Sequence, residues 1–175
     1  MPSAEAKRAY AIIQLGGRYA PAPGAQQQQQ PENPERARIQ QLQALMKAGN
    51  AAVAEGRYEA ALASFDTVVQ QFPDFATTEY ARLSRALMLY QLGRTSDALL
   101  QLEDLEVSLR GYAEVHAALA SMLYVERPAL LDYAEQQWAI AMDFSRNFAD
   151  PQWVAANKRW PPKMMAALDR FLRLA

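Results

Sequence analysis

The chain has 175 residues, of which 18 are Lys or Arg and 19 are Asp or Glu, and it contains no cysteine. Without cysteine it cannot form disulfides, thiolate nucleophiles or cysteine-bound metal clusters. A net charge of −1 with no large basic block argues against a nucleic-acid-binding protein. No stretch reaches the roughly 18 apolar residues needed to span a membrane. Alanine, leucine and glutamine dominate and β-branched residues are sparse, so the composition predicts an all-α fold.

The N-terminal part of the chain divides into two segments. Residues 1–20 contain a short helix-like stretch, Ala4–Leu15, and they lack the apolar run of a secretory signal. Residues 21–34 are rich in proline and include five consecutive glutamines, a composition typical of a linker that forms no core. We therefore predict an N-terminal helical segment over 1–20 and a linker over 21–34. The first long helix should begin near Pro34, since proline is favoured in the first turn of a helix.

Two predicted helix pairs follow, Gly49–Phe72 and Ala86–Leu105, and they share one pattern of small and large residues. Gly56 and Gly93 are 37 residues apart in the two predicted turns. Small residues let antiparallel helices approach closely, and large apolar residues fill the space between them. The matching positions are Gly49, Gly56, Ala61, Phe65 and Val68 in the first pair, and Ala86, Gly93, Ala98, Leu102 and Leu105 in the second.

This pattern resembles the tetratricopeptide repeat (TPR), a helix–turn–helix unit of about 34 residues. A third, degenerate unit is predicted over Tyr112–Asn147, where Ala134, Trp138 and Ala141 repeat the positions of the second helix. The resemblance implies a repeat domain over residues 35–147. It also implies the fold, a short α-solenoid of about three TPR-like repeats with a capping helix at its C-terminal end.

Residues 148–175 are predicted to form a tryptophan-containing loop and this capping helix, over Pro162–Leu174. The apolar residues of the helix lie at helical spacing: Met164, Met165, Leu168, Phe171 and Leu172. We expect them to cover the exposed face of the last repeat helix, around Trp138, Ile140 and Met142. The cap would then complete the solenoid.

Charge is distributed unevenly between the predicted repeats and the C-terminal part. Residues 42–145 carry a net charge of −7, and residues 146–175 carry +4. One interpretation is an acidic repeat surface that attracts a basic cap, with Lys158 and Arg159 facing it. The alternative is an acidic body that selects a basic partner.

The residues Lys158-Arg159-Trp160-Pro161-Pro162, followed by a closing helix, resemble the C-terminal part of TPR proteins from cyanobacteria and plastids. This second resemblance implies a photosynthetic lineage and a chloroplast location, with association with the thylakoid as one option. It implies no enzymatic activity.

The sequence contains no constellation of residues suited to catalysis. His116 is the only histidine, so a histidine-based metal site or nucleophile has no second member. Glu103, Asp104 and Glu106 cluster on one predicted helix, where carboxylates are more often solvated than catalytic. No glycine-rich phosphate-binding loop is present. We therefore predict that the chain is not an enzyme and binds no cofactor and no metal.

The TPR resemblance places partner binding in a groove lined by the first helix of each pair. The candidate groove residues are Gln43, Met46, Asn50, Val53, Tyr80, Leu83, Leu87, Tyr90 and Gln91. The residues from Tyr80 onward are mostly apolar, as expected for a surface that binds a protein segment. The alternative is that the chain's own N-terminal or C-terminal helix fills the groove.

One subclass of TPR proteins binds the C-terminal carboxylates of chaperones, and its signature is missing. Asn50 matches that signature, but Met46 and Ser84 stand where lysine and asparagine are required. Chaperone-tail binding is therefore not expected.

The expected function is that of a TPR-type scaffold or adaptor that binds a helix or an extended segment of another protein. The tail resemblance would place this adaptor in the assembly or maintenance of a photosynthetic complex. The alternative is a structural subunit built permanently into a larger plastid complex. A free adaptor should be soluble and monomeric, whereas an obligate subunit should expose a large apolar area.

Overall fold

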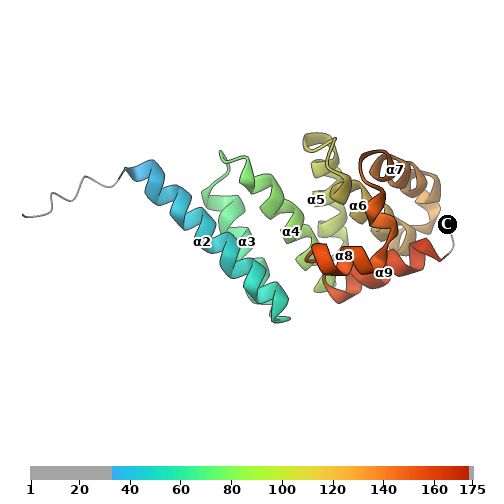
Figure 1. The fold of residues 1–175 in the computed structure, drawn as a ribbon, viewed down its shortest axis with the longest axis horizontal. Coiled ribbons are helices and arrows are strands. Elements are labelled where there is room, and N and C mark those ends of the chain that lie inside the picture. Colours follow the sequence, from blue (N-terminus) through green and yellow to red (C-terminus); the bar gives the residue numbers. More distant parts are fainter. Residues whose placement is uncertain (1–32, 174–175) are drawn as a thin grey trace, which may run out of the picture. The chain divides into compact units, whose positions relative to one another are not determined.

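A computed structural model describes residues 33–173, and within this range helices joined by turns are the only regular secondary structure (Figure 1). This confirms the predicted all-α class. The elements are α2 (Pro34–Ala54), α3 (Tyr58–Gln71), α4 (Thr77–Gln91), α5 (Thr95–Ser108), α6 (Ala113–Glu126), η1 (Pro128–Leu130), α7 (Leu131–Phe144), η2 (Arg146–Ala149), α8 (Pro151–Asn157) and α9 (Pro162–Leu172). The helix predicted near Pro34 begins at that residue. The predictions for residues 1–20 and for the linker before residue 33 lie outside the described residues.

Short turns reverse the chain between α2 and α3 and between α4 and α5. Gly56 and Gly93 occupy these turns with φ angles of 72° and 82°. A side chain would be strained in this left-handed conformation, which is why glycine ends the preceding helix. The turn after α2 is closed by a hydrogen bond of 2.8 Å from the Arg57 amide to the Ala52 carbonyl oxygen. Successive helices from α3 to α7 then pack side by side.

The small residues predicted to permit close helix approach are buried. A Cβ atom added at Gly49 of α2 would lie 2.7 Å from the Phe65 ring of α3. Ala61, Ala98 and Ala134, one in the second helix of each pair, are fully buried. The spacing of the sequence pattern therefore identified the residues at which the helices meet.

Helix α6 is the most enclosed element among those described. Every residue from Ala113 to Leu123 is buried, although this range includes the polar side chains Glu114, His116 and Ser121. The helix packs against α5, α7 and α9. A helix enclosed on all sides has no solvated polar face, which explains the nearly continuous run of alanine and larger apolar residues in its sequence.

The C-terminal helix α9 occupies a different place from the one expected of it. It packs mainly against α6 and also against α4, which are the first helices of their pairs. Only its end reaches α7, where the centre of the Phe171 ring lies 4.9 Å from that of Trp138; the same ring lies 5.4 Å from that of Tyr124 in α6. The expectation that α9 covers the face around Trp138, Ile140 and Met142 is therefore largely wrong. The large apolar side chains of α4 and α6 offered it a more extensive surface.

The stretch expected to be a loop between residues 148 and 161 contains the short helix α8. The Asp150 side chain caps this helix by accepting hydrogen bonds from the amides of Gln152 and Trp153, at 2.9 and 3.2 Å. Pro151 occupies the first helical position. An acidic cap followed by proline is a recognisable helix start, so this element could have been found in the sequence.

Candidate protein-binding groove

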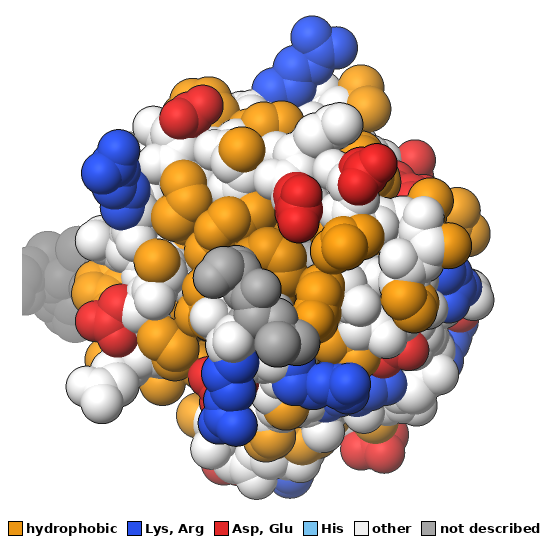
Figure 2. Space-filling view, turned by 90° about the vertical axis from the view of Figure 1, so that its right-hand side faces the viewer, with side chains coloured by type: hydrophobic (Ala, Val, Ile, Leu, Met, Phe, Trp, Pro, Cys, Tyr) orange, Lys and Arg blue, Asp and Glu red, His pale blue; other side chains and the backbone are white. Residues whose placement is uncertain are grey.

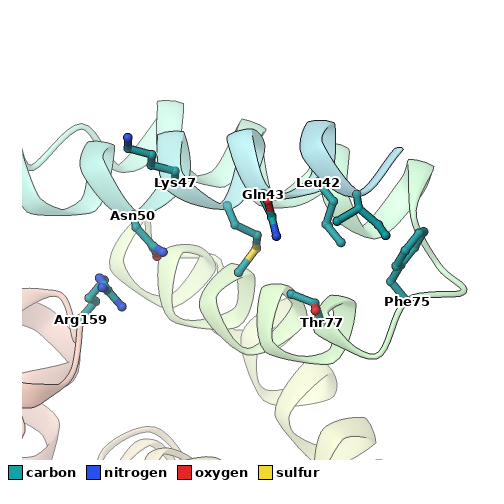
Figure 3. Close-up of a pocket in the computed structure, with 9 residues that line it drawn as sticks. Leu42, Gln43, Lys47, Asn50, Phe75, Thr77 and Arg159 are labelled. Atoms are coloured by element: carbon teal, nitrogen blue, oxygen red, sulfur yellow. The ribbon is translucent and has the colours of Figure 1, made fainter. Parts of the chain in front are cut away.

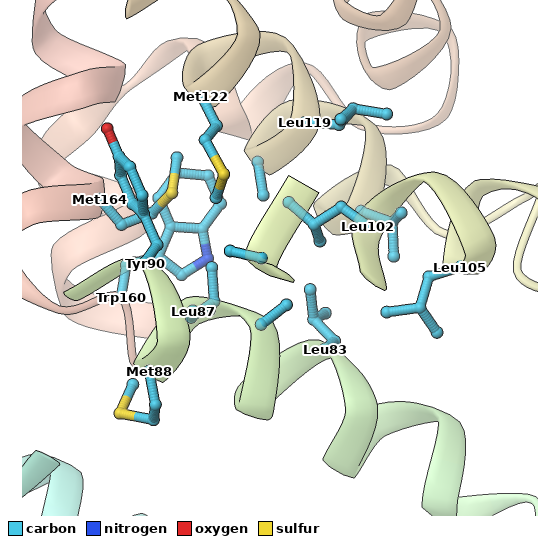
Figure 4. Packing of buried hydrophobic residues seen from close by; sticks show 14 of the residues in the cluster. Leu83, Leu87, Met88, Tyr90, Leu102, Leu105, Leu119, Met122, Trp160 and Met164 are labelled. Carbon is cyan, nitrogen blue, oxygen red and sulfur yellow. The ribbon is translucent and has the colours of Figure 1, made fainter. Parts of the chain in front are cut away.

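The nine candidate groove residues fall into two groups with different surroundings. Leu83, Leu87 and Tyr90 are buried, with exposed fractions of 4%, 3% and 1%. Leu87 and Tyr90 belong to the face of α4 and α6 on which α9 lies, which we call the covered face, whereas Leu83 lies farther along α4, on the side of Leu102 (Figure 4). These three side chains are part of the chain's own core, so they are not accessible to a partner in this structure.

The residues that close the covered face come from the C-terminal segment, residues 148–173. Figure 4 shows Trp160 and Met164 beside Tyr90 and Leu87 of α4. The backbone amide of Lys163 donates a hydrogen bond of 2.8 Å to Gln91 Oε1, so a further candidate residue is engaged by the same segment. Of the two occupants left open by the sequence, the C-terminal helix is the one that the structure shows here.

A buried glutamate anchors this segment to α6. Glu114 receives a hydrogen bond of 2.9 Å from Trp160 Nε1 and forms an ion pair of 2.8 Å with Lys158 Nζ. The same ammonium group lies between three aromatic rings, at 5.7 Å from Tyr112, 5.4 Å from Phe148 and 5.9 Å from Trp153. Cation–π attraction and the ion pair therefore act on one lysine.

A second anchor joins α9 to the end of α6. Tyr90 Oη donates a hydrogen bond of 2.8 Å to Glu126, and Lys163 Nζ lies 3.9 Å from the same carboxylate and 4.2 Å from the centre of the Tyr90 ring. Burial, together with this hydrogen bond to a carboxylate, raises the pKa of Tyr90 well above its ordinary range. Tyr90 therefore stays protonated and remains a hydrogen-bond donor.

The remaining candidates lie where α9 does not reach. Gln43, Met46 and Asn50 line an open groove of about 600 Å³ on one side of α2 (Figure 3). We call it the α2 groove; it is lined by Ile39, Leu42, Gln43, Met46, Lys47, Asn50, Phe75, Thr77 and Arg159. Val53 does not line it and is partly buried against the core. Tyr80 is 45% exposed and makes an edge-to-face contact with Tyr112 at 5.3 Å.

The loop between α3 and α4 forms one end of the α2 groove through Phe75. Arg38 of α2 holds this loop: its guanidinium donates two hydrogen bonds, of 3.2 and 3.0 Å, to the Asp74 carboxylate. It also lies 5.1 Å from the centre of the Phe75 ring. Thr78 Oγ1 donates a hydrogen bond to the Phe72 carbonyl oxygen across the loop. These interactions fix the loop that carries Phe75.

Six lining residues were not among the predicted site residues: Ile39, Leu42, Lys47, Phe75, Thr77 and Arg159. The α2 members were detectable, because positions 39, 42, 43, 46, 47 and 50 follow the spacing of one helix face. Arg159 was not, since it is far from α2 in the chain and reaches the groove only through the placement of the C-terminal segment.

His116 belongs to a buried network rather than to the groove. Its Nδ1 lies 2.7 Å from Gln137 Oε1, and its Nε2 lies 2.8 Å from the Arg110 carbonyl oxygen. Gln137 Nε2 donates a hydrogen bond of 2.7 Å to Glu106, which also accepts one of 2.5 Å from Tyr133. The network joins α5, α6 and α7, and it satisfies the polar groups that their packing buries.

Among residues 33–173, no group of three or more His, Cys, Asp or Glu side chains is placed to hold a metal ion. In the same range, none of the helices has both the length and the apolar character that crossing a bilayer requires.

Comparisons with protein-family models, with curated proteins and with solved structures found no match to this chain.

Proposed function

We propose that this chain is a protein-interaction module built from TPR-type helix pairs, and that it binds a segment of a partner protein in the α2 groove. Turn glycines with positive φ angles and fully buried alanines at matched positions support the TPR assignment. The observation that carries the binding proposal is the α2 groove itself, an open hollow of about 600 Å³ that combines apolar and polar side chains. Grooves of this mixed character suit helical or extended protein segments.

The biological setting of this proposal is a chloroplast adaptor that acts in the assembly or maintenance of a photosynthetic complex. Its support is the resemblance of Lys158–Pro162 and the following helix to plastid and cyanobacterial TPR proteins. In the structure these same residues attach the C-terminal segment to α6 through Lys158 and Trp160. Their role in packing is independent of where the protein acts.

A display library of random 12-residue peptides, selected on the full chain, tests the binding proposal. Gln43→Trp fills the groove without changing its charge, and Gln41→Trp, an exposed position of α2 that does not line the groove, is the matched control. We expect selected peptides to lose binding to Gln43→Trp by about tenfold or more and to keep it with Gln41→Trp. Failure to select any peptide, or equal loss with both variants, would contradict the proposal.

A second candidate function, a permanent structural subunit, is favoured by the exposed apolar side chains. Leu100, Val107 and Phe144 are 62%, 64% and 58% exposed. Figure 2 also shows hydrophobic side chains gathered at the end of the helix array where the chain leaves α9. Sedimentation of the purified full chain separates the two candidates: a monodisperse monomer supports the adaptor, and self-association or aggregation supports the subunit.

A further inference from the structure

The α2 groove carries an inference about the chemistry of its occupant. We propose that the groove binds an acidic amphipathic protein segment, whose apolar side chains lie against Leu42 and Phe75 and whose carboxylates lie near Lys47 and Arg159. This inference rests on the proposed function and specifies the partner of the same site.

One face of α2 forms the long wall of the groove. Its lining residues occupy positions 39, 42, 43, 46, 47 and 50, a spacing that keeps all of them on one side of a helix. The eleven helical steps from position 39 to position 50 rise about 16 Å. The wall therefore accommodates about three helical turns, or about five residues of an extended chain.

The two ends of the groove differ in polarity, as Figure 3 shows. Leu42 and Phe75 lie together at one end, whereas Asn50 and Arg159 approach each other at the opposite end; Lys47 lies at the rim on the neighbouring turn of α2, with its ammonium group directed away from Arg159. An occupant that matches this arrangement has its apolar residues at one end and its polar residues at the other.

The polar end is cationic. Lys47 and Arg159 are both exposed, and neither forms an ion pair or a side-chain hydrogen bond within residues 33–173. No aspartate or glutamate belongs to the lining of the groove. The neighbouring residue Lys158 shows the contrast, because its ammonium group is already paired with Glu114.

Charge complementarity then selects among possible occupants. A segment with carboxylates at this end gains charge-assisted hydrogen bonds from the Arg159 guanidinium, Asn50 can donate a further one, and Lys47 at the rim adds a longer-range attraction. A wholly apolar segment would cover the Arg159 guanidinium without pairing it, which is costly. A basic segment would be repelled.

The chain's own N-terminal helix was the other occupant left open by the sequence, and its charge does not match. Residues 1–20 carry Lys7, Arg8 and Arg18 against a single acidic residue, Glu5. The complementarity argument therefore favours a segment of another protein.

Charge reversal in the full chain tests this inference. Peptides selected on the wild-type protein are measured against the double variant Lys47→Glu/Arg159→Glu, with Arg146→Glu as the control at an exposed position outside the groove. Each selected peptide is compared with a counterpart in which Asp and Glu are replaced by Asn and Gln. We expect the selected peptides to be acidic and amphipathic. Their affinity should fall on the order of tenfold for the double variant, and likewise when their own carboxylates are replaced by amides. Arg146→Glu should leave their affinity unchanged. A selection repeated on the double variant should yield basic peptides.

Two results would each overturn a different proposal, one the acidic partner and the other the proposed function. Peptides that bind the groove, as shown by their sensitivity to Gln43→Trp, but ignore the charge reversal and the salt concentration would overturn the acidic partner while the proposed function stands. A wild-type chain that selects no groove-binding peptide would overturn the proposed function itself.

Discussion

The covered face and the α2 groove are built in the same way but have opposite charges. Each is formed by the first helices of neighbouring pairs, α4 and α6 in one case and α2 and α4 in the other. The covered face presents Glu114 and Glu126, and the C-terminal segment brings Lys158 and Lys163 to them. The α2 groove has no acidic lining residue and is itself cationic. A basic segment of the chain therefore finds complementary charges on one surface and none on the other.

This difference in charge explains why the C-terminal segment lies on the covered face and leaves the α2 groove open. The C-terminal segment also places large apolar side chains on the covered face, among them Trp160, Met164 and Phe171, and each contributes roughly 1.5–3 kcal/mol when fully buried. At the α2 groove the same segment contributes only Arg159 to the lining. Burial and charge together attach the segment to α6 and leave α2 accessible.

Removing the C-terminal segment should lower the stability of the chain more than any other change that we predict. A chain that ends after Asp150 loses α8 and α9 and exposes Leu87 and Tyr90 of α4. Because several large side chains lose their burial, the cost should be several kcal/mol, a large share of the stability of a typical domain. We expect loss of cooperative thermal unfolding, or aggregation, measured by circular dichroism. A chain that ends at Arg173 is the control, and a truncated chain that unfolds like this control would contradict the role of the segment.

Two adjacent cations should respond very differently to charge reversal. Lys158→Glu brings a second carboxylate to the buried Glu114 and removes the cation from its three aromatic neighbours. Disrupting a largely buried ion pair in this way should cost roughly 3 kcal/mol. Arg159→Glu changes an exposed side chain without an ion pair among the described residues, so unfolding in urea should shift by less than about 0.5 kcal/mol. Equal shifts for the two variants would refute the division between the covered face and the groove.

A smaller loss of stability is expected from a change in the network that joins α6 to α5 and α7. Gln137→Leu removes the amide that bridges His116 and Glu106; it leaves Nδ1 of the buried His116 without its partner and takes away one of the two hydrogen bonds that Glu106 accepts. We expect the free energy of unfolding to fall by about 2 kcal/mol. Gln136→Leu, at the exposed neighbouring position, is the matched control. Full stability in Gln137→Leu would mean that the network is not required to hold α6 between α5 and α7.

The smallest effect should occur at the apolar end of the α2 groove. Hydrogen bonds from Arg38 hold the pKa of Asp74 below its ordinary value of 3.8. Since the folded-state pKa is lowered, the stabilisation is present above about pH 4 and is lost as the pH falls through the folded-state pKa. Asp74→Asn should therefore lower the melting temperature slightly at pH 7, and this difference from the wild type should shrink as the pH falls below about 4. Asp143→Asn, an exposed position without an ion pair among residues 33–173, should leave the melting temperature unchanged at each pH.

Much of the helical architecture was predictable because it depends on local spacing. Gly56 and Gly93 mark turns that need a positive φ angle, and Ala61 and Ala98 mark the places where helices approach closely. Helix α8 was missed, although Asp150 before Pro151 is a local capping signal that could have indicated it. In each case the information lies within a few residues of the element it determines.

The candidate site was predictable only in part. Gln43, Met46 and Asn50 line the α2 groove as expected, since the pattern of one helix face reveals which residues share it. The same pattern could not show that Leu83, Leu87 and Tyr90 are covered. An apolar helix face looks alike in sequence whether it meets a partner or the chain's own terminus.

The sequence by itself determined the helical class, the start of α2 at Pro34, the turn glycines and the small residues at the helix crossings. It did so because backbone conformation and helix-face periodicity are set by neighbours in the chain. Only the tertiary structure decided that α9 lies on α6 and α4, that Glu114 pairs with Lys158, and that Arg159 joins α2 to complete a groove. These pairings connect residues far apart in the chain. Each depends on how several surfaces compete for the same segment through burial and charge, and no local pattern records the result of that competition.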